Sequence, residues 1–174
     1  LLLPDTFEGD TTVSFEFLPL HGYPVSSTYY EVDGGLQQEY SGPFAVSGAG
    51  THTIRFWSVD QAGHVETPKS YTFTIVNIPP TISEGDTFII GKFEDDPDFY
   101  HIPPVLHAMD PELSNVITWQ ILSGPSHGSA SVQASGFSSE FTYLSELNYF
   151  GMDSFIVQAS DNFGGTDTIE VRVY

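Results

Sequence analysis

The stretch "DSFIVQASDNFGGTDTIEVRVY", residues 153–174, decides the fold class. It contains two segments, "DSFIVQAS" and "DTIEVRVY", in which apolar and polar residues alternate. Because successive side chains of a β-strand point to opposite faces, this period of two indicates strands with one buried face. Between the two segments, "DNFGG" supplies an Asp and two Gly residues that suit a turn. The stretch therefore predicts two half-buried strands separated by a turn.

The same alternation recurs along the rest of the chain. It is present in "TVSFEF" (12–17), "HTIRFWSV" (52–59), "SYTFTIV" (70–76), "NVITWQIL" (115–122) and "SEFTYL" (139–144). Turn residues in "DGG" (33–35) and "SGAG" (47–50) predict two hairpins. No window of about 11 residues keeps a helical apolar period without an interrupting Gly or Pro. We therefore predict an all-β protein built from sandwiches.

A domain boundary is predicted in "VNIPPTI", residues 76–82. Its two prolines cannot donate hydrogen bonds to a sheet and they hold the backbone extended, so residues 77–81 read as a linker. Domains 1–77 and 78–174 each have about the size of one immunoglobulin-like sandwich. A single large sandwich with a proline-rich crossover is the alternative.

The charge balance excludes several partners. The chain has 23 Asp and Glu residues against 4 Lys and Arg residues, a formal net charge of −19. Such a field repels phosphate backbones and anionic lipid surfaces, so we expect no nucleic-acid partner. No run of about 18 apolar residues is present, so we expect no membrane insertion by this segment. The run "EDDPD" (94–98) is interpreted as a solvated loop, because it lacks the Gly and Glu of an EF-hand loop.

Residues 29–69 carry a series of spaced motifs: "YYEVDGG", "YSGPF", "GTHTI" and "SVDQAGHVE". In this order they resemble a bacterial immunoglobulin-like module of exported proteins, with His64 where that pattern has Asn. The resemblance implies a β-sandwich without catalysis.

Residues 80–173 look like a cadherin-like tandem repeat of large bacterial surface proteins. The matching pieces are "PTISEGD", "HAMDPE", "ITWQILSGPSHGSA" and "FTYLSELNYFGMDSFIVQASDNFGGTDTIEVRV". The resemblance implies a second sandwich with calcium ligands at one end, near the linker. Carried over by motif, the ligands are Glu84, Asp110, Glu112 and Asp161.

Calcium takes six to eight oxygen ligands, so converging carboxylates suit it and would repel one another without it. The chain departs from the family pattern in Glu112, where the pattern has Asp, and in Ile78, where the linker pattern has Asp. Turn formation is the alternative role for Asp161, and it is the favoured one for Asp60 and Asp33, since Asp readily accepts hydrogen bonds from turn backbone.

No catalytic constellation stands out. The chain has no Cys, no Gly-x-Ser-x-Gly motif and no His pair spaced for zinc, so we predict that it is not an enzyme. It is interpreted as an extracellular spacer or adhesion segment of a larger bacterial cell-surface protein. Its partners would be neighbouring repeats of the same polypeptide and a cell-surface glycan or protein, and calcium would rigidify it.

Two other functions remain open. One is a carbohydrate-binding accessory module of a polysaccharide-degrading enzyme. Adjacent Tyr29 and Tyr30 must point to opposite faces of a strand, and Trp57 points away from Ile54 and Phe56, so an outward aromatic pair could stack on a sugar ring. A core position is the competing interpretation for Trp57 and for Trp119. The other function is a filament subunit assembled by strand addition, with the apolar start "LLLP" as donor.

Overall fold

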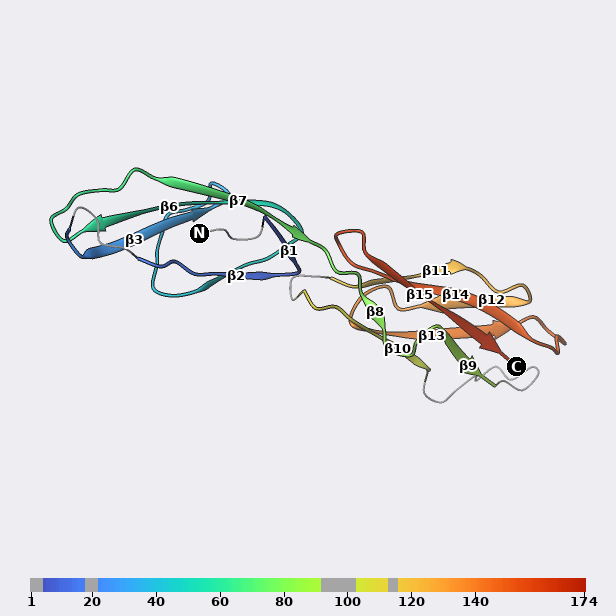
Figure 1. The fold of residues 1–174 in the computed structure, drawn as a ribbon. Coiled ribbons are helices and arrows are strands. Elements are labelled where there is room, and N and C mark those ends of the chain that lie inside the picture. The colour runs from blue at the N-terminus through green and yellow to red at the C-terminus, as the bar shows by residue number, and fades with distance from the viewer. Residues whose placement is uncertain (1–4, 18–21, 92–102, 113–115) are drawn as a thin grey trace. The chain divides into compact units, whose positions relative to one another are not determined.

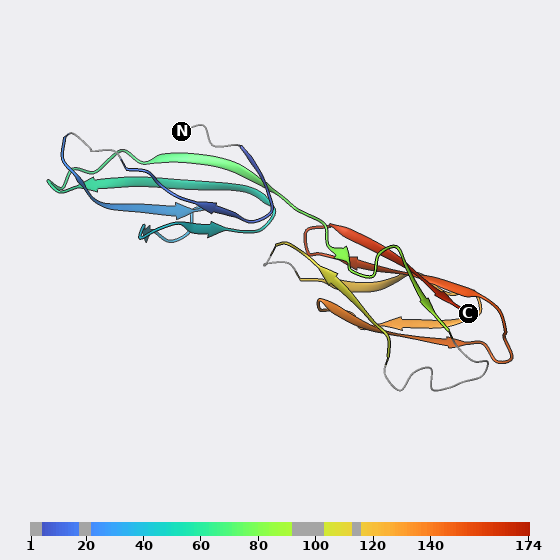
Figure 2. The same cartoon turned by 60° about the horizontal axis from the view of Figure 1, so that its bottom comes forward.

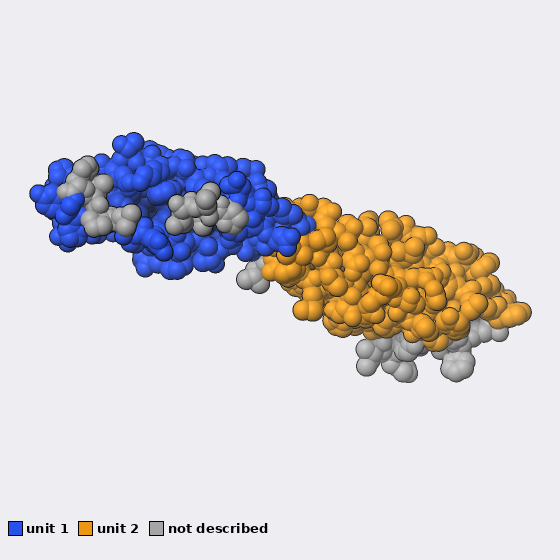
Figure 3. All heavy atoms as spheres, in the orientation of Figure 1, with its two compact units in different colours: residues 1–77 blue, residues 78–174 orange. Residues whose placement is uncertain are grey.

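A computed structural model describes residues 5–17, 22–91, 103–112 and 116–174. The chain divides into two compact units, Leu1–Asn77 and Ile78–Tyr174, called unit 1 and unit 2 below and coloured separately in Figure 3. The division falls inside the proline-containing segment. Both "EDDPD" and "LLLP" lie outside the described residues, so the interpretations attached to them are not addressed by the structure.

Unit 1 is a β-sandwich (Figure 1). Its described strands are β1 (Thr6–Glu8), β2 (Thr11–Val13), β3 (Val25–Val32), β4 (Gln38–Glu39), β5 (Phe44–Val46), β6 (Gly50–Asp60) and β7 (Lys69–Val76). They form a five-stranded sheet in the order β1-β7-β6-β3-β4 and a two-stranded sheet of β2 and β5. The edge strand β1 pairs with β7 in parallel, whereas β3, β6 and β7 pair antiparallel.

The core of unit 1 lies between these two sheets. Tyr30, Ile54, Phe73 and Ile75 are buried on the inner face of the large sheet, as their alternation predicts. The segment "TVSFEF" is strand only up to Val13, which corrects the predicted strand. Beyond it, Phe15 packs its ring at 5.0 Å from Phe56 and 4.9 Å from Tyr40. Ring packing, not a sheet ladder, therefore holds this segment.

One of the two predicted hairpins is present. The "DGG" turn joins β3 to β4, with Gly35 N donating to Val32 O at 2.8 Å. Asp33 and Gly34 have φ of 52° and 71°, the left-handed values that a tight hairpin turn requires. The "SGAG" hairpin is wrong. It connects β5 to β6, but β5 pairs with β2 while β6 pairs with β3 and β7, so this turn passes between sheets.

Unit 2 is a second sandwich, and both of its sheets are visible in Figures 1 and 2. In the part of the chain that the structure describes, one sheet has the order β12-β13-β10-β8 and the other the order β11-β14-β15-β9. The bounds are β8 (Thr81–Ile82), β9 (Thr87–Ile90), β10 (Val105–Met109), β11 (Thr118–Ser123), β12 (Gly128–Val132), β13 (Ser138–Ser145), β14 (Asp153–Ser160) and β15 (Thr166–Val173). The edge strand β9 pairs with β15 in parallel.

The opening stretch of the sequence forms β14 and β15, which pair antiparallel from Asp153↔Val173 to Ser160↔Thr166. Alternate residues of both strands enter the core between the sheets. The fully buried side chains there include Phe155, Val157, Ile169 and Val171, and Phe141 faces them from β13. Unit 2 thus has a continuous apolar core of its own, separate from the core of unit 1.

The structure confirms the predicted fold class. Each unit is an antiparallel β-sandwich with a short parallel edge pairing, and no helix occurs among the described residues. Accordingly, no helix in those residues is long and apolar enough to cross a membrane.

Candidate functional site

Two of the predicted calcium ligands meet at the end of unit 2 where its chain begins. Asp110 and Glu112 follow β10, whose last residue pairs with the first residue of β8. Glu112 is 2% exposed and accepts a hydrogen bond at 2.7 Å from the backbone N–H of Ile78. Asp110 accepts one at 3.0 Å from the backbone N–H of Glu112. The two carboxyl groups also interact directly.

Burial raises the pKa of Glu112, and the neighbouring Asp110 carboxyl raises it further. Hydrogen bonding from Ile78 works in the opposite direction but does not cancel the rise. A cation placed beside both groups would reverse this balance, because an opposite charge favours the ionised carboxylate. The pair is therefore chemically suited to a divalent cation.

Asp161 lies at the same end of unit 2, where β14 stops and β15 starts. One of its carboxylate oxygens accepts hydrogen bonds at 2.8 Å from the backbone N–H groups of Phe163 and Gly165. Its own N–H donates to Gly165 O at 3.0 Å. The turn role weighed for Asp161 is therefore present in the structure. We call Asp110, Glu112 and Asp161 the acidic end of unit 2.

Glu84 is engaged elsewhere. Its two carboxylate oxygens contact His107, one at 2.7 Å from the ring nitrogen Nδ1 and the other at 3.0 Å from the backbone N–H. Another acid, Asp167, contributes at this end instead, accepting a hydrogen bond at 2.7 Å from Ile82 N and so tying β15 to β8 across the sandwich. No local pattern marks Asp167, because its partner lies 85 positions away.

The fit to calcium is thus incomplete among the described residues. Two carboxyl groups are brought together, and no group of three or more His, Cys, Asp or Glu side chains in this part of the chain has the spacing of a metal cluster. Calcium would require further oxygens from carbonyl groups or water to reach its usual six to eight. The calcium site stays a prediction.

Tyr29 and Trp57 form the outward-facing aromatic pair of unit 1. Tyr30 is buried in the core, so Tyr29 is the outward tyrosine, and it pairs across the strands with Trp57. Their ring centroids are 6.1 Å apart, and the Arg55 guanidinium lies 5.1 Å from the Trp57 ring. Trp119, in contrast, is a core residue of unit 2, with its indole N–H donating to Gly136 O at 2.8 Å.

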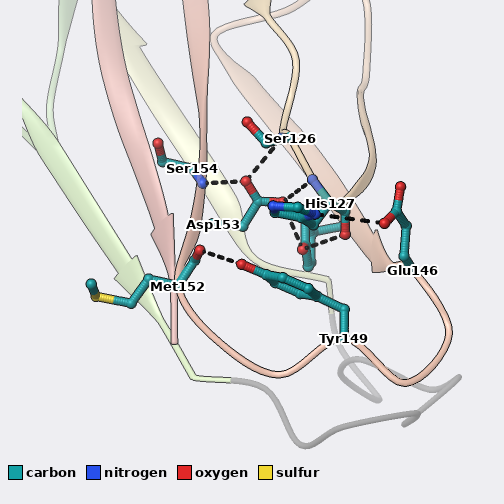
Figure 4. A network of polar contacts seen from close by, with 8 residues as sticks. Ser126, His127, Glu146, Tyr149, Met152, Asp153 and Ser154 are labelled. Atoms are coloured by element: carbon teal, nitrogen blue, oxygen red, sulfur yellow. Dashed lines mark hydrogen bonds and ion pairs between the residues drawn. The ribbon is translucent and has the colours of Figure 1, made fainter.

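At the opposite end of unit 2, Asp153 organises a polar network (Figure 4). It is 8% exposed and accepts hydrogen bonds from the backbone N–H groups of Ser126, His127 and Ser154, each at 2.9 Å, and from the Tyr143 hydroxyl at 3.0 Å. Burial alone would raise the pKa of Asp153, but these donors lower it below its ordinary value. Burial and the Asp153 charge raise the pKa of Tyr143. Sequence reasoning assigned no role to either residue.

Of the turn acids of unit 1, Asp60 bonds to its own turn as expected, whereas the Asp33 carboxylate bonds to β6. Asp60 is 2% exposed and accepts hydrogen bonds from the backbone N–H groups of Ala62 and His64 at 2.8 and 2.9 Å. The His64 ring adds a contact at 2.8 Å, using the residue that departs from the family pattern. Asp33 accepts a hydrogen bond from Thr53 N at 2.7 Å and contacts the His52 ring at 2.8 Å.

The sequence of residues 77–174 matches the bacterial Ig domain family. Since this match spans more than half of the chain and all of unit 2, the chain belongs to that family. The predicted resemblance of the second half to a bacterial surface-protein repeat is confirmed by this match. No curated protein sequence matches the chain.

Several solved structures match the chain at low sequence identity. The extracellular cadherin domains 1–5 of protocadherin gamma B2 match with 16% identity and a TM-score of 0.41, covering 98% of this chain and 38% of that one. The D00-D0 domain of intimin matches with 9% identity and a TM-score of 0.32, covering 98% and 95%. The Bacteroides ovatus protein SGBP-B, in complex with a mixed-linkage heptasaccharide, matches with 12% identity and a TM-score of 0.32, covering 98% and 43%. This chain thus spans well under half the length of the protocadherin structure.

Proposed function

We propose that this chain is a non-catalytic spacer or adhesion segment of an extracellular bacterial surface protein. The observation that carries the proposal is the succession of two sandwich units, the second a bacterial Ig domain, each with its own closed apolar core. Units with separate cores keep their shape when joined in series, which is what a spacer requires. Bacterial Ig domains and cadherin ectodomains are typically extracellular and non-catalytic, which agrees with this role.

Calcium is the cofactor we propose for the acidic end of unit 2. The support is the buried Glu112 carboxyl beside that of Asp110, because repulsion between the two is a cost to the folded state in the absence of a cation. Glu112 of this pair also holds the first residue of unit 2, because it accepts a hydrogen bond from the Ile78 N–H. Metal bound there would therefore stiffen the chain at the start of unit 2, and neighbouring repeats of the polypeptide would be its partners.

Thermal unfolding in EDTA and in millimolar calcium tests this proposal. The chain has 2 Trp residues, Trp57 in unit 1 and Trp119 in unit 2, so a Trp57→Phe background reports on unit 2 alone. Calcium at roughly 10 to 100 times its Kd should stabilise unit 2 by about 1.4 to 2.7 kcal/mol. Asp161→Asn should reduce this shift, and Asp86→Asn, which changes an exposed acid of the same unit, should leave it intact.

An absent shift, or an equal shift with magnesium, would count against specific calcium binding. Magnesium is the matched control because it demands a smaller, near-octahedral set of ligands. The spacer role would then have to stand without a bound metal.

A carbohydrate-binding module is the second candidate function, favoured by the outward pair Tyr29 and Trp57. Aromatic rings on a sheet face can stack on the apolar face of a pyranose. Retention on insoluble polysaccharide that is lost in Trp57→Ala and Tyr29→Ala, but kept in Thr72→Ala on the same sheet, would support it. Equal retention of all the variants would remove this candidate.

A further inference from the structure

A shallow pocket of about 440 Å³ lies at the end of unit 2 opposite the acidic end. Its lining includes His127, Tyr149, Ser154, Glu170, Arg172 and Tyr174. The pocket sits over the outer side of β14 and β15, where Ser154 pairs with Arg172. Its volume falls within the range of small-molecule sites.

The walls of this pocket are held by the network of Figure 4. The His127 and Tyr149 rings stack at 4.1 Å between centroids and are 14° from parallel. The Tyr149 hydroxyl donates to Met152 O at 2.9 Å, and buried Asp153 fixes the backbone of His127. These contacts order the aromatic wall before any ligand arrives, which lowers the entropic cost of binding.

The polar side of the pocket offers a donor and an acceptor side by side. Arg172 donates through Nε and Nη2 to Glu170 at 2.9 and 2.7 Å, and both side chains remain partly exposed. The Arg172 contact lowers the pKa of Glu170, so its carboxylate stays an acceptor at neutral pH. A neighbouring donor and acceptor match the geometry of adjacent hydroxyl groups on a sugar ring.

The sheet order argues against an extended peptide as the ligand. Both β14 and β15 are interior strands of their sheet, so their backbone groups already pair with neighbouring strands. Strand addition needs an unpaired edge, which this face does not provide. A ligand in this pocket must therefore be bound by side chains and not by strand backbone.

Charge narrows the class of ligand further. Glu146 and Glu170 flank the pocket, and the whole chain carries a formal net charge of −19. Acidic sugars would meet repulsion there, whereas uncharged ones would not.

From this geometry we propose that the pocket binds an uncharged saccharide, with the ring stacked on the aromatic wall and hydroxyl groups bonded to Arg172 and Glu170. This inference rests on the adhesion role proposed above and names its ligand class. It places recognition on unit 2, away from the Tyr29 and Trp57 surface of unit 1.

Titration of the whole chain with methyl glycosides, followed by ¹H–¹⁵N NMR, tests the proposal. The probes are the neutral methyl glycosides of glucose, galactose, mannose, fucose and N-acetylglucosamine, with methyl glucuronide as the acidic counterpart. At least one neutral glycoside should shift the amide signals of His127, Ser154 and Arg172. Arg172→Gln should weaken its Kd about tenfold, the loss expected for one hydrogen bond to a charged group.

Thr168→Ala is the matched control, because Thr168 is an exposed residue of the same strand outside the pocket lining. It should leave the Kd unchanged. The proposal is overturned if no neutral glycoside shifts these amides, if the shifts map to Trp57 instead, or if the glucuronide binds as tightly. Calcium stabilisation of unit 2 is measured without sugar, so a negative sugar titration would not count against the spacer proposal.

Discussion

Replacing Asp153 with Ala should destabilise unit 2 more than any exposed substitution in that unit. Asp153 is 8% exposed, and its carboxylate accepts hydrogen bonds from Ser126, His127, Ser154 and Tyr143. Alanine removes the acceptor while the donors remain part-buried. The segment before β12 and the start of β14 would lose their common anchor.

The size of the effect follows from these contacts. A hydrogen bond to a charged group contributes about 1.5 to 3 kcal/mol, and bonds that share one carboxylate are not additive. Loss of the set should therefore cost about 3 to 5 kcal/mol, as for removal of one partner from a buried charged pair. At about 4 to 8 °C per kcal/mol, the Tm of unit 2 should fall by at least about 12 °C.

Urea unfolding followed by Trp119 fluorescence measures this loss. In a Trp57→Phe background the signal comes from unit 2, where the Trp119 side chain is buried at 4% exposure. Because the folded pKa of Asp153 is lowered, its contribution is present above the ordinary value of 3.8 and is lost as the pH falls through the folded value. The gap between the wild-type protein and the variant should therefore close in acid.

Asp86→Ala, at an exposed acid of the same unit, is the control and should change stability by less than about 0.5 kcal/mol. A loss for Asp153→Ala no larger than that of the control, or a gap that stays constant down to pH 2, would refute the anchoring role.

Three further results are expected. Both ring nitrogens of His52 face acceptors, namely the Asp33 carboxylate and Gly48 O. Burial opposes the charged imidazolium, but these two contacts raise the pKa of His52 above its ordinary value of 6.5. The stability contributed by the His52–Asp33 ion pair is therefore complete below pH 6.5 and is lost as the pH rises through the pKa of His52 in the folded protein. Urea midpoints of unit 1 should thus fall between pH 5.5 and 8.5, and His52→Gln should reduce the fall. Phe141→Ala should cost unit 2 about 3 to 5 kcal/mol while leaving the Trp57-monitored midpoint of unit 1 unchanged. Glu112→Gln should raise the Tm of unit 2 in EDTA at pH 7. The pKa of Glu112 is raised in the folded protein, so at any pH above the ordinary value of 4.5 ionisation of this carboxyl destabilises the fold. A lower Tm would contradict this.

Periodicity was sufficient to predict most of the long strands, and β3 is the exception, because none of the alternating segments covers it. The alternating segments became β6, β7, β11, β13, β14 and β15, because a buried face imposes the period of two directly. Which strands pair with one another could not be predicted from this pattern. The parallel edge pairings of β1 with β7 and β9 with β15 join segments far apart in the chain, and the pattern within a strand carries no mark of its neighbour.

The candidate sites show the same limit. Turn acids such as Asp161 and Asp60 bond to backbone groups within four positions, so local sequence predicts them well. Glu84 contacts His107, 23 positions away, and Asp153 contacts Ser126, 27 positions away, so both roles depend on the tertiary fold. Tyr29 and Tyr30 could be predicted only in part. Alternation along the strand requires that the two side chains point to opposite faces of the sheet, but only the packing of the two sheets decides which of them is buried.

Whether the chain is a spacer stiffened by calcium can be measured from the distance between two labels, one on each unit. The chain contains no Cys, so Gln37→Cys and Ser129→Cys, both at exposed positions, can carry spin labels without further changes. If calcium stiffens the chain, the distance distribution should be broad in EDTA and should narrow to a single peak in millimolar calcium. A distribution of the same width in both conditions would contradict it.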